Sequence, residues 1–296
     1  MAKRKGIHIA MAVFVSLAVA AFTSCVKDEL HDTSHPDKAK LTVTADWSRR
    51  GPSIAVPASW SMVMGDYSET ETGGTHAPDY LFTPGDYRLI TWNPAENITV
   101  EGTTATAATS ADGFVNPSLG WLFTSVQDVT LEADRMYDIT AVMEQQVRQL
   151  TLTIFPSGAT VDRITSMECT LTGVAGSMDF ATNTYGNEST VPLHFRQITE
   201  GEDAGGWTVT VYLLGMMGGR QYLSGYVTFA DNNPQPMFIE SDMTEIFSDP
   251  YGHFNDDKAD PVLLFSEDMM ETPTGAGMSA TITDWETAGR EDIEIN

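Results

Sequence analysis

Apolar and polar residues alternate along much of this chain, and this period of two is its strongest structural signal. Between residues 41 and 47, Leu41, Val43 and Ala45 fall on one face, while threonine and aspartate occupy the other. Because successive side chains of a β-strand point to opposite faces of a sheet, this pattern predicts a strand with one buried face. Similar alternation or short apolar runs predict further strands at residues 59–65, 87–92, 98–100, 126–131, 136–143, 150–154, 164–171, 191–195, 207–217, 221–229 and 278–282.

Turn-forming residues separate these segments, and helical spacing is rare. Residues 83–86 carry adjacent Pro and Gly, and the pair Gly218-Gly219 predicts a tight β-hairpin between the strands on either side of it. The stretch 67–78 is expected to be an exposed loop, and 103–110 a loop or a weak edge strand with little to pack. Helical spacing is best at 241–247. Many short strands, frequent turns and one short helix predict an all-β chain of β-sandwiches.

The longest apolar stretch of the chain lies at its start. Basic residues precede an apolar run at 7–22, which is the composition of a signal peptide. Small residues then lead to Cys25, as in bacterial lipoproteins that are cut before a lipid-carrying cysteine. The pattern therefore predicts a signal peptide at 1–24, cleavage after Ser24 and lipid on Cys25. No later stretch reaches the roughly 20 apolar residues that a membrane-spanning helix needs.

Residues 25–40 are polar and lack any period, so we expect them to be a lipidated tether that holds the body off the membrane. Lys27, Asp28 and Glu29 resemble the surface-export signal of Bacteroidetes lipoproteins. A plain solvated tether is the alternative interpretation of these charges. The two histidines of the tether have no third metal ligand nearby in sequence, so no metal site is predicted there.

Loss of the leader would leave 272 residues, a length that suits two domains of ordinary size. We place the domains at 41–146 and 147–296, because the strands before residue 146 already suffice for one sandwich. If Cys25 carries lipid, Cys169 has no partner for an intrachain disulfide. Cys169 falls on the inward face of its predicted strand and is expected to be a small buried residue.

The acidic composition excludes one class of partner. The chain has 16 Lys and Arg against 41 Asp and Glu, a net charge of −25, and loss of residues 1–24 would make it −28. Such a surface repels nucleic acids and anionic lipid headgroups. We therefore expect no nucleic-acid partner.

The sequence carries no familiar catalytic motif. It has no phosphate-binding loop, no dinucleotide-binding glycine pattern and no paired metal-binding motif, so we predict neither an enzyme nor a cofactor. His194 has no acid or nucleophile that the sequence places near it, and residues 255–260 lack the spacing of a calcium loop. A glycosidase with paired carboxylates stays an alternative, since a sequence gives no distances. Trp121 and Trp285 fall outside clear strand patterns and are the candidates for an exposed sugar-binding platform.

Four segments, together with the motif around Cys25, share a likeness to one protein family. They are residues 43–48 (VTADWS), 84–93 (PGDYRLITWN), 146–154 (QVRQLTLTI) and 171–177 (LTGVAGS). Through them the chain resembles the fimbrillin superfamily of Bacteroidetes lipoproteins, in particular fimbrial anchor or accessory subunits. The resemblance implies two transthyretin-like β-sandwich domains in tandem.

The resemblance also implies a function. It implies a cell-surface, outer-membrane lipoprotein that anchors or assembles fimbriae, and so serves adhesion, with fimbrial subunits bound by strand addition. Stalk subunits of the family are trimmed after an arginine, which removes a first strand. Arg49 and Arg50 follow the first predicted strand, but a basic turn is the alternative, and an anchor should keep both strand and lipid. The competing hypothesis is a glycan-binding surface lipoprotein of a polysaccharide-uptake system.

The lipid prediction can be tested on whole cells. Protease added to intact cells should digest the body of the protein, because the lipid on Cys25 would hold it on the outer surface. The Cys25→Ser variant should lose its membrane attachment, as followed by blotting of cell fractions. Protection of the body until the cells are lysed would contradict the surface location.

Overall fold

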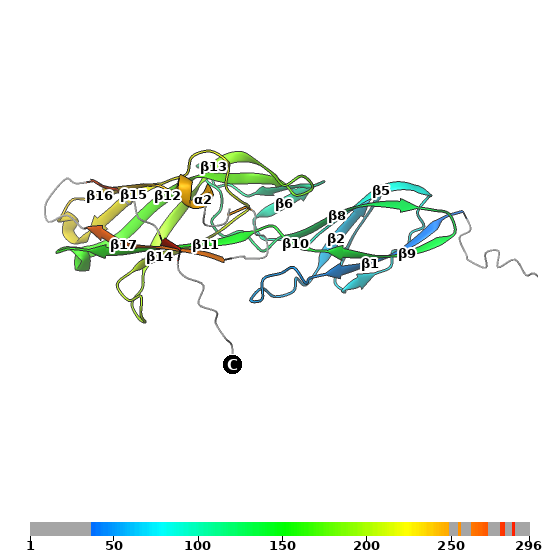
Figure 1. Ribbon diagram of the computed structural model, residues 1–296, viewed down its shortest axis with the longest axis horizontal. Helices are drawn as coiled ribbons and strands as arrows, with labels where there is room; N and C mark the ends of the chain where they lie inside the picture. Colours follow the sequence, from blue (N-terminus) through cyan, green and yellow to red (C-terminus); the bar gives the residue numbers. More distant parts are fainter. Residues whose placement is uncertain (1–36, 249–253, 256–261, 272–278, 282–285, 288–296) are drawn as a thin grey trace, which may run out of the picture.

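The computed structural model describes residues 37–248, 254–255, 262–271, 279–281 and 286–287, and these are built almost entirely of β-strands. Figure 1 shows an elongated molecule in which two bodies follow one another along the long axis. The all-β, β-sandwich prediction is confirmed. Among the described residues, no helix has the length and apolar character needed to cross a membrane.

The N-terminal body consists of two sheets that face one another. The three-stranded sheet has the order β4-β1-β9 and the five-stranded sheet the order β10-β8-β5-β2-β3. Their bounds are β1 Ala39–Asp46, β2 Trp60–Met64, β3 Tyr67–Glu71, β4 Thr75–His76, β5 Gly85–Trp92, β8 Phe123–Leu131, β9 Arg135–Val142 and β10 Glu144–Gln145.

Strand β1 shows how the alternating sequence builds this body. Its residues alternate between buried and half-buried, and Leu41 and Val43 are fully buried. Trp60, Met62 and Met64 of β2 belong to the same hydrophobic cluster from the other sheet. Burial of one such side chain contributes ~1.5–3 kcal/mol to folding, so the predicted apolar face of residues 41–47 is what holds the first strand in place.

The C-terminal body is one continuous sheet that folds over on itself. Its strands run in the order β18-β16-β15-β12-β13-β14-β11-β17-β19, with β6 and β7 attached to β12. Their bounds are β6 Ile98–Glu101, β7 Thr104–Ala107, β11 Arg148–Ser157, β12 Ile164–Asp179, β13 Thr184–Gln197, β14 Trp207–Leu213, β15 Tyr222–Phe229, β16 Met237–Asp242, β17 Val262–Glu271, β18 Ser279–Thr281 and β19 Glu286–Thr287. Three short helical segments accompany them: η1 Val161–Arg163, η2 Ala230–Asn232 and α2 Thr244–Ser248.

The long hairpin β12–β13 organises the C-terminal body. Strand β13 pairs with β12 over most of its length but with β14 only at Arg196 and Gln197. The two halves of the sheet therefore form two layers, and residues of both layers share one large hydrophobic cluster. The turn of the hairpin, near residues 180–183, extends toward the N-terminal body.

The stretch 103–110 differs from the prediction. It was expected to have little to pack, yet Ala105 and Ala107 of β7 are buried in the large cluster. Strand β7 pairs with β6 and with the end of β12 at Ser177–Asp179, and alanine is small enough to fit under that hairpin. The core of the C-terminal body thus includes residues from both sides of the predicted domain boundary between 146 and 147. The boundary itself stays a prediction.

The hairpin prediction at Gly218-Gly219 was wrong. Strand β14 pairs with β11 and β13, while β15 pairs with β12 and β16. The intervening chain crosses from one layer to the other, with Leu214 and Met216 buried. The amide of Met217 donates a hydrogen bond to the carbonyl of Gly173 (2.8 Å). Burial of this crossing outweighs the local turn signal of two glycines.

The helix and one loop also differ from the predictions. Ser241 and Asp242 belong to strand β16, and the helix begins at Thr244, whose amide donates to the Asp242 carboxylate (3.0 Å). This carboxylate, two residues before the helix, satisfies an amide of the first turn that has no partner within the helix, which favours a helix start at Thr244. The expected loop 67–78 is largely exposed but contains the short strands β3 and β4.

A glycine in the larger body gives a stability test. A Cβ atom at Gly225 would lie 2.5 Å from the Cα of Cys169, whereas one at the exposed Gly218 would meet nothing within 4 Å. Gly225→Ala should therefore destabilise the protein by ~1–3 kcal/mol, and Gly218→Ala should stay within ~0.5 kcal/mol. Denaturant unfolding of both variants measures this, and equal midpoints would contradict the packing described.

Candidate functional site

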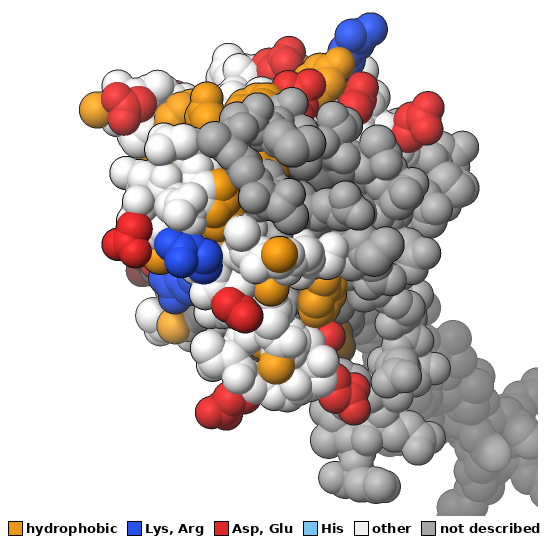
Figure 2. Space-filling view, turned by 90° about the vertical axis from the view of Figure 1, so that its left-hand side faces the viewer, with side chains coloured by type: hydrophobic (Ala, Val, Ile, Leu, Met, Phe, Trp, Pro, Cys, Tyr) orange, Lys and Arg blue, Asp and Glu red, His pale blue; other side chains and the backbone are white. Residues whose placement is uncertain are grey.

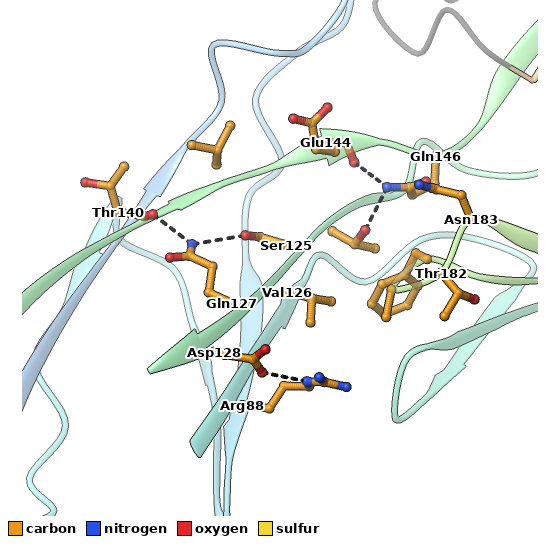
Figure 3. Close-up of a pocket in the computed structure, with 14 residues that line it drawn as sticks. Arg88, Ser125, Val126, Gln127, Asp128, Thr140, Glu144, Gln146, Thr182 and Asn183 are labelled. Atoms are coloured by element: carbon orange, nitrogen blue, oxygen red, sulfur yellow. Dashed lines mark hydrogen bonds and ion pairs between the residues drawn. The ribbon is translucent and has the colours of Figure 1, made fainter. Parts of the chain in front are cut away.

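A groove of about 860 Å³ lies where the two bodies meet (Figure 3). The N-terminal body supplies Arg88, residues 124–128 and side chains between 140 and 146. The C-terminal body supplies residues 180–183, the turn of the hairpin β12–β13. Most of this lining is polar, so the groove suits a ligand that offers hydrogen-bonding groups.

The groove follows a gap in the strand pairing. Strand β8 pairs with β5 along one edge, and with β10 only at Phe123 and Thr124; β9 pairs only with β1 among the described strands. Residues 125–131 and 135–142 therefore present two free strand edges, which we call the seam. Free strand edges carry unpaired N–H and C=O groups and can accept another strand.

One side chain bridges the seam. The Gln127 amide nitrogen donates to the backbone carbonyl of Thr140 (2.8 Å) and to the Ser125 hydroxyl (3.3 Å), as the dashed lines of Figure 3 show. In a strand, the N–H and C=O of one residue point to the same side, and alternate residues point to opposite sides. The Thr140 N–H therefore also faces the seam, where a side-chain contact replaces a ladder of backbone hydrogen bonds.

Charged groups flank the seam on the five-stranded sheet. Arg88 donates a hydrogen bond to the Asp128 carboxylate (2.9 Å), and both side chains are exposed. This hydrogen bond lowers the pKa of Asp128 below its ordinary value and raises that of Arg88. Both groups therefore stay charged at neutral pH, and the seam has a fixed polar rim. An exposed pair of this kind adds little to stability.

The chain crossing between the bodies forms the inner end of the groove. Gln145 accepts a hydrogen bond from the Gly51 amide (3.1 Å), and Gln146 donates to the Thr124 hydroxyl (2.8 Å). Both glutamines are buried, and Trp121 packs against the hydrophobic clusters of both bodies. Because buried amides are held by their hydrogen bonds, these contacts fix the shape of this end of the groove.

The residues predicted for export and lipidation lie outside the described part of the chain. These are Ser24, Cys25, Lys27, Asp28 and Glu29, and they stay predictions. The tether histidines, Trp285 and most of the acidic stretch 255–260 also lie outside the described residues.

Arg49 and Arg50 lie in the turn that follows β1. The Arg49 side chain is exposed and lies 3.9 Å from the Glu144 carboxylate, measured from Nε to Oε1. Arg50 is half-buried, and its Nε donates to the carbonyl of Ile54 (3.0 Å). A cut at this turn would separate β1 from the rest of its sheet. Whether a protease cuts there stays a prediction.

The other singled-out residues have structural partners. Trp121 is half-buried with its ring edge against Tyr212, so the expected exposed platform does not form there. Cys169 is buried as predicted, and burial, with a smaller effect of the Glu168 charge, raises its pKa to about 12. A reactive thiol needs the opposite shift. His194 pairs with Glu168 across β12 and β13, although the sequence had placed no acid beside it.

No local pattern in the sequence predicts the seam. Gln127, Thr140 and the turn 180–183 come from segments far apart in the chain, and none carries a motif. The strands 126–131 and 136–143 were predicted near their observed bounds, but a local pattern does not say which neighbour a strand pairs with. Only the pairing reveals that β8 and β9, although consecutive, lie in different sheets.

Comparison with known proteins identifies similar chains. The family model described as "Fimbrillin-A associated anchor proteins Mfa1 and Mfa2" matches residues 64–290, well over half of the chain. No curated protein sequence matches.

Several solved structures share the fold. The fimbrial anchor protein Mfa2 from Porphyromonas gingivalis has a TM-score of 0.53 at 11% identity, over 77% of this chain and 90% of that one. A candidate adhesin from Bacteroides ovatus has a TM-score of 0.53 at 13% identity, over 87% and 96%. A candidate polysaccharide-binding protein from Bacteroides thetaiotaomicron has a TM-score of 0.56 at 10% identity, over 77% and 90%. Identities this low establish the fold alone.

Proposed function

Because the chain belongs to the family of fimbrillin-A associated anchor proteins, we propose that it is a lipid-anchored subunit of the outer membrane that holds or assembles fimbriae. In this proposal the seam binds a fimbrial subunit by taking up one of its strands. The family implies association with fimbrial subunits and a location at the cell surface. Its members are structural proteins, which agrees with the prediction that this chain is not an enzyme.

The free edges of β8 and β9 carry the proposal. An extended segment that enters between them would replace the single Gln127 bridge with backbone hydrogen bonds to both strands. Main-chain pairing supplies affinity, and the polar side chains along the groove supply specificity. A free edge next to a formed groove would otherwise be a site of uncontrolled association, so a partner that covers it is physically favourable.

The position of β1 supports an anchor rather than a stalk subunit. Strand β1 is paired with β9 over its whole length, from Ala39 to Asp46, and its inward side chains are buried. In the anchor that we propose, this strand stays in place, Arg49-Arg50 is an ordinary basic turn, and residues 25–40 join the body to lipid on Cys25. Lys27, Asp28 and Glu29 would direct the protein to the outer face.

Glycan binding is the second candidate function. The description of one similar structure as a candidate polysaccharide-binding protein favours it, as does the polar lining of the groove. Sugar sites usually add an exposed aromatic ring for stacking, and Trp121 is already engaged with Tyr212. Strand addition therefore explains the groove better, and the test below separates the two functions.

Thr140→Pro tests strand addition directly. Proline removes the N–H that faces the seam and is tolerated where a strand's N–H faces outward, so the pairing of β9 with β1 should survive. We expect the amount of fimbrial subunit that co-purifies with the protein from outer membranes to fall roughly tenfold or more. Thr140→Val is the matched control, since it keeps the N–H and the size of the side chain.

Two results would contradict the proposal. Equal recovery of fimbrial subunits with both variants would mean that the seam is not where they bind. The glycan function would be favoured if the wild-type protein is retained on a glycan array and variants of groove side chains are not. In that case those variants would still recover fimbrial subunits as the wild type does.

A further inference from the structure

Three metal-ligating side chains converge at the other edge of the N-terminal body. Glu69 and Glu71 of β3 and His76 of β4 bring one donor atom each within 4.8 Å of one another. His76 Nε2 lies 3.3 Å from Glu69 Oε2, and His76 Nδ1 lies 3.1 Å from Glu71 Oε1. The hydroxyl of Tyr67 lies 2.9 Å from His76 Nε2 and also contacts Glu69.

The strand registers place these side chains on the inner faces of the two sheets. Glu69 is paired with Met62 and Glu71 with Trp60, both of which are core residues. Cross-strand partners point to the same face of a sheet. His76 is paired in the same way with the buried Val43 of the other sheet. Positions that an ordinary sandwich fills with apolar residues thus hold two carboxylates and an imidazole.

Among the described residues, the two carboxylates of this cluster share one histidine, His76, as their ion-pair partner. The side chains of His76 and Glu71 are only 12% and 24% exposed, and that of Glu69 is 45% exposed. A neutral imidazole would leave two negative charges close together in a partly buried place, which is unfavourable unless a cation compensates them.

Protection of a sheet edge is a simpler explanation but a partial one. Inward-pointing charges on an edge strand prevent it from pairing with another chain, and either glutamate would serve that purpose. It does not account for a histidine on the opposite sheet that faces both carboxylates. The convergence of three ligands from two sheets calls for something that binds between them.

We propose that Glu69, Glu71 and His76 bind one divalent transition-metal ion, with zinc the best match, and that this ion links β3 to β4. Imidazole nitrogen suits zinc, and carboxylate oxygens complete mixed zinc sites. The ion closes the edge of the sandwich that lies away from the seam. It leaves a fourth position for water, and the Tyr67 hydroxyl stays beside the other ring nitrogen of the histidine, Nε2.

The geometry needs a modest adjustment to receive the ion. Ligands of a tetrahedral zinc ion lie roughly 3.3 Å apart, since each is about 2.0 Å from the metal. The two carboxylates face different nitrogens of the ring, so one of them must rotate toward the nitrogen that binds. Glu69 is the more exposed glutamate, and by rotating it would give up its contact with the Tyr67 hydroxyl.

Zinc titration of the full chain by calorimetry tests the site. We expect Glu69→Gln/Glu71→Gln and His76→Ala to lose one equivalent of zinc, or to bind it roughly tenfold or more weakly. His194→Ala is the matched control, because His194 also pairs with a glutamate but has no second one beside it in the part of the chain that the structure describes. The histidines other than His76 and His194 are present in every variant, so the loss of zinc in the His76 and glutamate variants, compared with the wild type and His194→Ala, reports this site.

A second measurement guards against misfolding of the variants. Zinc should raise the thermal midpoint of the wild-type and His194→Ala proteins, and the rise should vanish in the glutamine double variant, which keeps the side-chain shapes. Cobalt(II) should give the visible absorption bands of a low-symmetry site in the wild type, and these bands should be absent from the glutamine double variant. Equal zinc stoichiometry and equal thermal shifts in the wild type and the double variant would overturn the proposal.

Discussion

The pairing of β1 with β9 is the interaction on which the N-terminal body depends. Eight residues, Ala39 to Asp46, lie in parallel register with β9, and they bring Leu41 and Val43 into the core. Four of the fourteen buried residues of this cluster come from β1. The same strand directly follows the proposed tether. Stability of the sandwich and attachment to the membrane would therefore rest on one short segment, which explains why an anchor would keep it uncut.

The two edges of this sandwich have opposite character. At one edge, β3 and β4 bring Glu69, Glu71 and His76 together, and a bound ion would close it. At the other edge, the facing edges of β8 and β9 are unpaired beside a groove, and Gln127 alone spans them among the described hydrogen bonds. A closed edge and an open edge on one body direct association to a single side. The acidic surface adds repulsion between copies, and Figure 2 shows acidic side chains spread over the described part of one end of the molecule.

Local sequence pattern predicted the strands well and their partners poorly. The alternation in residues 41–47 and the inward place of Cys169 follow from side-chain periodicity, and the structure confirms both. The hairpin at Gly218-Gly219 failed because burial of the crossing chain decides the pairing there. The seam and the cluster of Glu69, Glu71 and His76 depend on which strands become neighbours across two sheets. That information lies in long-range packing, and a single sequence carries no local signal for it.

Hydrogen exchange along β9 tests the central claim, that the seam takes up a strand. The amides of Met136, Asp138 and Thr140 share the side that faces the seam, whereas those of Tyr137 and Ile139 face β1. In a complex with a fimbrial subunit, exchange of the first three amides should slow by roughly tenfold or more, with the other two unchanged. A stable complex in which the seam-facing amides exchange at their free rates would contradict the account.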